Sequence, residues 1–280
     1  MGFKDILLHL PDVAAASALL DAAVPMARRY GAHLIGLNVY ETARPLAMVT
    51  DGYMDPMIVQ RFADESRKAA LENAAKVQAI FEERLRLEGI SGEWRVVEGL
   101  PSATVALHAR YVDVTMFSRP AGEVVGIDIA EEVLFASGRP VLVVPQAFPC
   151  GNIGQRVLIG WNATRECARA VADALPVLRG AEMVRVLTIA TIPIEGEKEA
   201  LLTAEDLGRH LARHGVKVSV ATAAAGLLNA HDVLLNEVSD SDADLLVIGG
   251  YGHGRLRELL LGGVTRAMLR HGTGPVMLSH

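Results

Sequence analysis

The fold is decided by an apolar stretch that occurs twice: residues 243–248 read Ala-Asp-Leu-Leu-Val-Ile, and residues 112–117 read Val-Asp-Val-Thr-Met-Phe. Short runs of this kind are typical of strands buried on both faces of a parallel sheet. After each one, a helical stretch leads to a second apolar run that closes its half, at 139–144 and at 274–278. The sequence therefore predicts two copies of one structural unit.

Outward from these runs, strands and helices alternate in the same order in both halves. Strands are predicted near 4–9, 33–39, 93–98, 112–117 and 140–145, and again near 155–161, 183–190, 216–221, 243–248 and 274–278. The clearest helices span Ala14–Arg29, Asp55–Glu88, Thr164–Leu178 and Ala204–Arg213. This alternation with right-handed crossovers indicates the α/β class, with two tandem doubly wound parallel-sheet domains. The proline and glycine of residues 146–152 mark the boundary, giving domains 1–148 and 153–280.

Composition narrows the class of protein. The chain has 280 residues, 51% of them hydrophobic, and a net charge of -6, which disfavours nucleic acid and anionic membranes as general partners. No apolar run is long enough for a membrane span, and Pro11 and Asp12 come too early for a signal peptide. Cys150 and Cys167 form no metal or disulfide framework and are expected to be free thiols. A cytoplasmic location is expected.

The chemistry of the second half is concentrated in a glycine-rich stretch after its fourth strand, Ile248-Gly249-Gly250-Tyr251-Gly252-His253-Gly254, which ends at Gly262-Gly263-Val264. A helix is expected to begin near Gly263. Ligands bind at the carboxyl ends of strands in doubly wound sheets, where glycines and a helix N-terminus offer backbone amides to an anion. The stretch is neither a Walker loop nor GxGxxG. A surface turn that binds nothing explains the glycines equally well.

This stretch resembles the signature of the universal stress protein family, G-x2-G-x9-G-[S/T], with its glycines at Gly249, Gly252 and Gly262. Leu-Arg-His-Gly-Thr-Gly-Pro-Val at 269–276 and Trp-Asn-Ala-Thr at 161–164 also resemble that family. The resemblance implies an adenine nucleotide alpha-hydrolase-like (HUP-type) fold, often dimeric, in which some members bind ATP. It places the base near Asn162 and Ile189. The phosphates would lie near Ile248, Gly249, Gly252, His253, Gly262, Gly263 and Val264.

The sequence departs from that signature at two positions and in one whole half. Gly263 replaces the usual Ser or Thr, and Asn162 stands where nucleotide binders usually have Asp. The first half lacks the loop: the segment from its fourth to its fifth strand is shorter and carries Pro120 and Glu123. One site per chain is therefore expected, with ATP or another adenine nucleotide as ligand. Residues 44–88 either cap the first half or form a solvated amphipathic helix.

Two further functions stay open. No nucleophile and base stand at a recognisable spacing, so little or no catalysis is expected, at most weak ATP hydrolysis. An adenylate-chemistry enzyme is one alternative, and an interaction protein that binds no nucleotide is another. Asp240, Asp242 and Asp244 are explained better by a turn than by a calcium loop. The closing strands are expected to pair as a pseudo-dimer, and a further homodimer is plausible.

Overall fold

The computed structural model describes residues 2–42, 56–120, 127–149, 151–190, 195–224, 229–250 and 263–280. The first half contains β1 (Asp5–His9), α1 (Val13–Tyr30), β2 (His33–Tyr40), α3 (Pro56–Glu88), β3 (Gly92–Glu98), α4 (Pro101–Ala109), β4 (Val114–Arg119), α5 (Ile127–Ser137) and β5 (Val141–Pro145). The second contains β6 (Arg156–Gly160), α6 (Arg165–Leu178), β7 (Met183–Ala190), α7 (Glu195–Arg213), β8 (Val218–Ala224), α8 (Ala230–Asp240), β9 (Leu245–Gly249), α10 (Gly263–His271) and β10 (Val276–Ser279).

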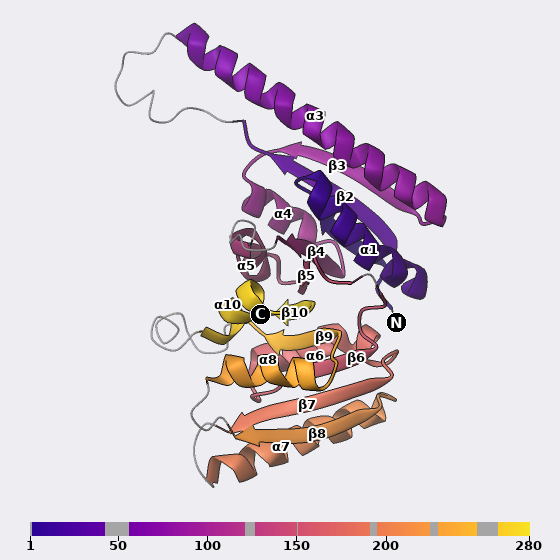
Figure 1. Ribbon diagram of the computed structural model, residues 1–280, viewed down its shortest axis with the longest axis vertical. Helices are drawn as coiled ribbons and strands as arrows, with labels where there is room; N and C mark the ends of the chain where they lie inside the picture. The colour runs from indigo at the N-terminus through magenta and orange to yellow at the C-terminus, as the bar shows by residue number, and fades with distance from the viewer. Residues whose placement is uncertain are drawn as a thin grey trace.

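One ten-stranded sheet runs through the molecule, in the order β3-β2-β1-β4-β5-β10-β9-β6-β7-β8 (Figure 1). Read from its own first strand, each half has the same order, and every strand pair within a half is parallel. The α/β doubly wound class is confirmed. The halves meet where β10 pairs antiparallel with β5, Met277 opposite Leu142, so the predicted pairing of the closing strands is also confirmed.

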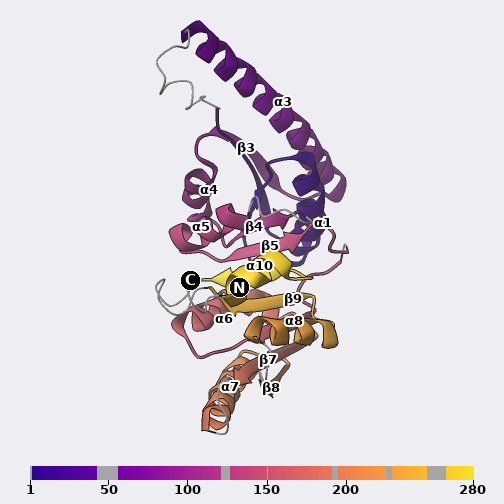
Figure 2. The same cartoon turned by 60° about the vertical axis from the view of Figure 1, so that its left-hand side comes forward.

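Helices cover both faces of this sheet in two layers (Figure 2). Buried side chains of α1, α3, α6 and α7 form one apolar cluster, and those of α4, α5, α8 and α10 form the other. Because each half contributes to both layers and both share the sheet, the apolar area removed from water is continuous from one half to the other. That burial is the main force that holds the halves together.

A repeated aspartate fixes the amino edge of the sheet in each half. The carboxylate of Asp113 accepts hydrogen bonds from the backbone N–H groups of Lys4 and Asp5, at 2.5 and 3.1 Å. Asp244 does the same for Gly154, Gln155 and Arg156, with the shortest N···O distance at 2.8 Å. The two residues stand one position before the fourth strand of their halves. Of the three aspartates at 240, 242 and 244, which the sequence assigned to a turn and not to a calcium loop, Asp244 therefore has a structural role: it binds the backbone amides at the start of β6.

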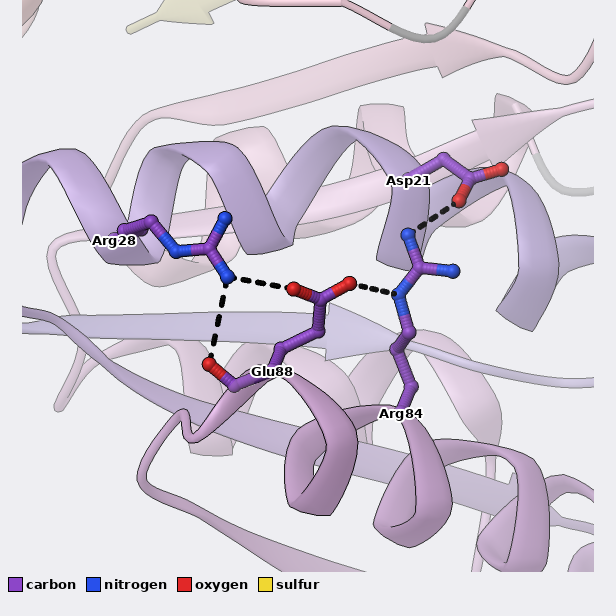
Figure 3. A network of polar contacts seen from close by, with 4 residues as sticks. All are labelled: Asp21, Arg28, Arg84 and Glu88. Carbon is purple, nitrogen blue, oxygen red and sulfur yellow. Dashed lines mark hydrogen bonds and ion pairs between the residues drawn. The ribbon is translucent and has the colours of Figure 1, made fainter.

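Among the described residues, the long helix α3 buries side chains only in its carboxyl-terminal half, although Arg67 of its amino-terminal half also contacts Glu98 of β3 at 3.6 Å. Arg84 contacts both Asp21 of α1 and Glu88, at 2.8 and 3.3 Å, and Arg28 of α1 binds Glu88 at 2.6 Å (Figure 3). Buried residues of α3 begin only at Ala74. The amino-terminal turns extend past the sheet, so the solvated-helix interpretation holds for that part (Figure 1).

Two expectations from composition are addressed by the described residues. Cys167 is a buried free thiol, while Cys150 lies outside the described residues. Across the described ranges, no helix combines the length and apolarity needed to cross a membrane.

Candidate functional site

The candidate site lies at the carboxyl ends of β6, β7 and β9. Gly160, the last residue of β6, pairs with Ile248 of β9, and Asn162 follows two residues later. Ile189 lies near the end of β7. Because β9 and β10 are parallel, the helix that connects them, α10, begins at this same edge, at Gly263.

The structure thus brings several of the predicted site residues to one edge of the sheet. These are Asn162, Ile189, Ile248, Gly249, Gly263 and Val264. Gly252, His253 and Gly262 lie outside the described residues. Ile248 is buried and Ile189 half-buried, both on the face covered by α8 and α10. The helix start predicted near Gly263 is confirmed.

Asn162 forms the turn that starts α6. Its Oδ1 accepts hydrogen bonds from the backbone N–H and the hydroxyl of Thr164, at 3.2 and 2.8 Å. Thr164 in turn caps α6 by accepting from the N–H of Cys167 at 3.3 Å. Ala163 between them has a φ of 56°, in the left-handed region. The Oδ1 atom is therefore used by the turn, and the amide nitrogen of this exposed side chain is the group left to contact a ligand.

Gly249 has a packing reason to be glycine. A Cβ at this position would lie 2.5 Å from the backbone nitrogen of Cys167 and 2.7 Å from the carbonyl carbon of Glu166. The first turn of α6 therefore lies directly against the end of β9. The sequence pattern alone suggested that this glycine serves the approach of an anion, whereas the structure shows the approach of a neighbouring helix backbone.

Glu166 is a charged residue of this region that the sequence reasoning missed. Its side chain is buried in the first turn of α6 and contacts the guanidinium of Arg165 at 2.5 Å. Burial raises the pKa of the carboxyl, but hydrogen bonds from Arg165 and from its own backbone amide outweigh burial and hold that pKa below its usual value. The site edge thus carries a buried negative charge. The sequence signal that could have revealed it is the acidic residue two positions after Thr164, which caps the helix.

Three buried polar atoms near this edge have no hydrogen-bond partner within the part of the chain that the structure describes. They are Trp161 Nε1, Thr188 Oγ1 and Ser279 Oγ. Ser279 pairs in register with Gly249, and Thr188 precedes Ile189 on β7. Buried polar groups without partners are uncommon, and a ligand is one of the things that can satisfy them.

The matching edge of the first half is filled by its own side chains. Asn38 donates to the carbonyl oxygen of Leu10 at 2.7 Å, and His9 is buried beside Phe117 with ring centroids 5.6 Å apart. Burial lowers the pKa of His9 to about 4, despite the nearby charge of Asp12. Arg119 is also buried here. Glu123 lies outside the described residues.

A separate cavity of about 410 Å³ lies between α6 and α7. It is lined by Trp161, Ala163, Ala168, Val171, Ala172, Thr203, Asp206, Leu207 and His210. Most of these residues are small or apolar. The cavity belongs to the face opposite Ile189 and Ile248, so it is distinct from the predicted position of the base.

Comparisons with known proteins agree with this architecture. Among solved structures, a universal stress protein from Archaeoglobus fulgidus matches with a TM-score of 0.75 at 17% identity, covering 99% of this chain and 96% of that one. A protein from Pseudomonas aeruginosa assigned to the same family matches with a TM-score of 0.61 at 18% identity, covering 99% and 93%. At such identities the likeness concerns the fold.

The sequence comparisons concern about half of the chain. A universal stress protein of Synechocystis is 24% identical over 150 residues, 52% of this chain, and the chain spans about half (49%) of that relative's length. Residues 155–280 match the universal stress protein family model. The second half of the chain is thus similar to the universal stress protein family.

Proposed function

We propose that the protein binds one adenine nucleotide per chain in its second half and acts as a regulatory or protective protein of the stress response. The observation that carries the proposal is the position of the glycine signature. It starts at Gly249, the last residue of β9, and ends directly before α10, which begins at the same sheet edge. Both ends of the glycine signature therefore lie at the edge of the sheet where doubly wound folds bind ligands.

Each part of a nucleotide has a counterpart at this edge. The phosphates would be held by backbone amides of the glycine stretch and by the N-terminus of α10, whose dipole favours negative charge. The base would lie near Ile189, with the amide nitrogen of Asn162 as a donor. The hydroxyls of Thr188 and Ser279, which are buried and have no partner among the described residues, would bind ribose or phosphate oxygens if the site opens to admit the ligand.

Titration calorimetry with ATP and with AMP tests the proposal. We expect one site per chain, and we expect Gly252→Val to abolish binding, because a branched side chain there would hold the phosphates away from the amides. Asn162→Ala should weaken binding, and Asn152→Ala, an exposed position in the connector, serves as its matched control. Two equivalent sites, or a site that survives Gly252→Val, would refute the assignment.

The alternative that a specific observation favours is an interaction protein without nucleotide. The buried Glu166 carboxylate lies beside β9, and Gly263 provides no hydroxyl, so both disfavour a phosphate. If millimolar ATP gives no heat of binding and displaces no bound probe, the result favours this alternative. Mass spectrometry of small molecules released from the gently purified protein would distinguish a bound nucleotide from none.

A further inference from the structure

We propose that Arg119, a residue of the first half, is a positioning residue for the nucleotide site of the second half. This inference rests on the function proposed above. It gives the first half, which lacks the glycine signature, a direct part in binding.

The contact is made across the junction of the halves. Arg119 is the last residue of β4, and its side chain is buried. Its Nη1 donates to the carbonyl oxygens of Met268 and Leu269 at 3.1 and 3.0 Å, and its Nη2 donates to the carbonyl oxygen of Gly272. Met268 and Leu269 belong to the last turn of α10, and Gly272 directly follows the helix.

This arrangement adds donors to the end of α10, where the Met268 carbonyl also accepts from the backbone N–H of Gly272 at 3.0 Å. The last carbonyl groups of a helix have no N–H donor within the helix, and burial makes them costly to leave unpaired. A guanidinium supplies several donors and a positive charge that complements the negative end of the helix dipole. Arg119 serves both purposes for α10.

Gly272, whose carbonyl oxygen accepts from Arg119, also has little room for a side chain. A Cβ at Gly272 would lie 2.5 Å from the carbonyl oxygen of Met268 and 3.3 Å from Nη1 of Arg119. Gly272 and Arg119 therefore fit each other, although they are far apart in the sequence. The Met268 carbonyl oxygen, more than the guanidinium, accounts for Gly272, and neither reason involves the phosphates.

The contact of Arg119 with the carboxyl end of α10, called the brace from here on, also affects the position of the amino end, because the helix is short. It has nine residues, a length of about 14 Å, and starts at Gly263 and Val264, whose amides are expected to meet the phosphates. A shift or fraying at the carboxyl end therefore changes the direction of the amides at the amino end. The salt bridge from Arg266 of α10 to Glu131 of α5, 3.2 Å long, is largely exposed on the Arg266 side and contributes less.

The equivalent position of the second half carries no such arginine. Arg119 lies six positions after Asp113, and the residue six positions after Asp244 is Gly250, which has no side chain to reach α5. Gly250 instead packs against Leu134 of α5, where a Cβ would meet the Leu134 Cδ2 at 2.7 Å. The first half thus holds the helix of the second half with a buried guanidinium, whereas among the described residues the second half reaches the end of α5 with the half-exposed Arg169 of α6, whose Nη2 donates to the carbonyl oxygen of Gly138 at 3.3 Å.

The test compares Arg119→Met with wild type in the full chain, by two readouts. Titration with ATP should show binding weakened about tenfold or more, the range of typical coupling between linked sites. Hydrogen exchange should accelerate in α10 and stay unchanged in α6 and β7, whereas a general loss of stability would raise exchange everywhere. Arg110→Met is the matched control, because the exposed Arg110 donates to the carbonyl of Ala136 at the end of α5 and should change neither readout.

The outcomes separate the inference from the proposed function. If Arg119→Met matches wild type in ATP affinity or in α10 exchange, the inference is wrong. If wild type binds no ATP, the proposed function fails, and α10 exchange alone then supports or overturns the brace. If Arg119→Met does not fold, Arg119→Lys replaces it: a single ammonium cannot serve three carbonyls, so both readouts should fall between wild type and full loss, and wild-type behaviour would overturn the inference.

Discussion

The first turn of α6 touches the end of β9 so closely that a Cβ at Gly249 would lie 2.5 Å from the backbone nitrogen of Cys167. Two backbones in such contact cannot yield as a flexible side chain would. The first glycine of the signature is therefore required by the fold itself, whether or not a nucleotide binds.

Gly249→Ala should destabilise the protein by about 1–3 kcal/mol, because the added methyl forces α6 away from the sheet. Denaturant unfolding measures the loss. Gly180→Ala is the control, since a Cβ there has its nearest neighbour, the carbonyl oxygen of Val177, at an ordinary 3.7 Å. Equal stability of Gly249→Ala and wild type would show that the contact relaxes at no cost.

Asp244→Ala should cost about 1–3 kcal/mol of the free energy of unfolding, because it leaves the amides of Gly154, Gln155 and Arg156 without their acceptor. Asp240→Ala, at an exposed position four residues earlier, should stay within about 0.5 kcal/mol of wild type. Chemical denaturation of both variants checks the pair. A calcium-binding role for these aspartates would instead make the loss at Asp244 depend on chelators.

The buried imidazole of His9 should make stability depend on pH. Its pKa is about 4 in the folded protein and 6.5 in the unfolded chain, so the unfolded state binds a proton first as pH falls. The free energy of unfolding should therefore fall between pH 6.5 and 4, by about 3 kcal/mol in total, and this contribution should be constant outside that window. Urea unfolding across the range measures it. His9→Leu should flatten the dependence, and the exposed His210→Gln should leave it intact; a slope that survives His9→Leu would assign it to other groups.

The sequence predicted regular elements well and contacts between distant residues poorly. The strand expected at 33–39 spans His33–Tyr40, and the one expected at 183–190 matches in full, because apolar runs with clear ends specify strands locally. The helix expected from Ala204 begins at Glu195, since Gly196 and the charged residues around it hide the apolar period. Neither the contact of Gly249 with α6 nor the brace from Arg119 leaves a local pattern, because each joins segments that only the folded sheet brings together.

Gly263→Ser should strengthen ATP binding, because it restores the hydroxyl that the family signature usually has. A hydrogen bond to a charged group contributes about 1.5–3 kcal/mol, so the dissociation constant should fall about tenfold or more. Gly263→Ala is the matched control: it raises helix propensity at least as much as serine does and adds no hydroxyl. If both variants gain equally, the effect comes from a firmer α10 and the phosphate contact at this position is absent.

Glu166→Gln should also strengthen ATP binding, for an electrostatic reason. The carboxyl is ionised at neutral pH because its pKa lies below the usual value, and it lies in the helix turn that contacts Gly249, so it repels an approaching phosphate. Removing one such charge near a partly buried site is worth on the order of 1 kcal/mol, a several-fold gain in affinity that salt should diminish. Glu182→Gln, an exposed position ahead of β7 at the opposite edge of the sheet, controls for net charge. Calorimetry that finds Glu166→Gln binding ATP no better than Glu182→Gln would place the phosphates away from α6, and a loss of binding would give Glu166 a positive role, as an acceptor for the ribose hydroxyls.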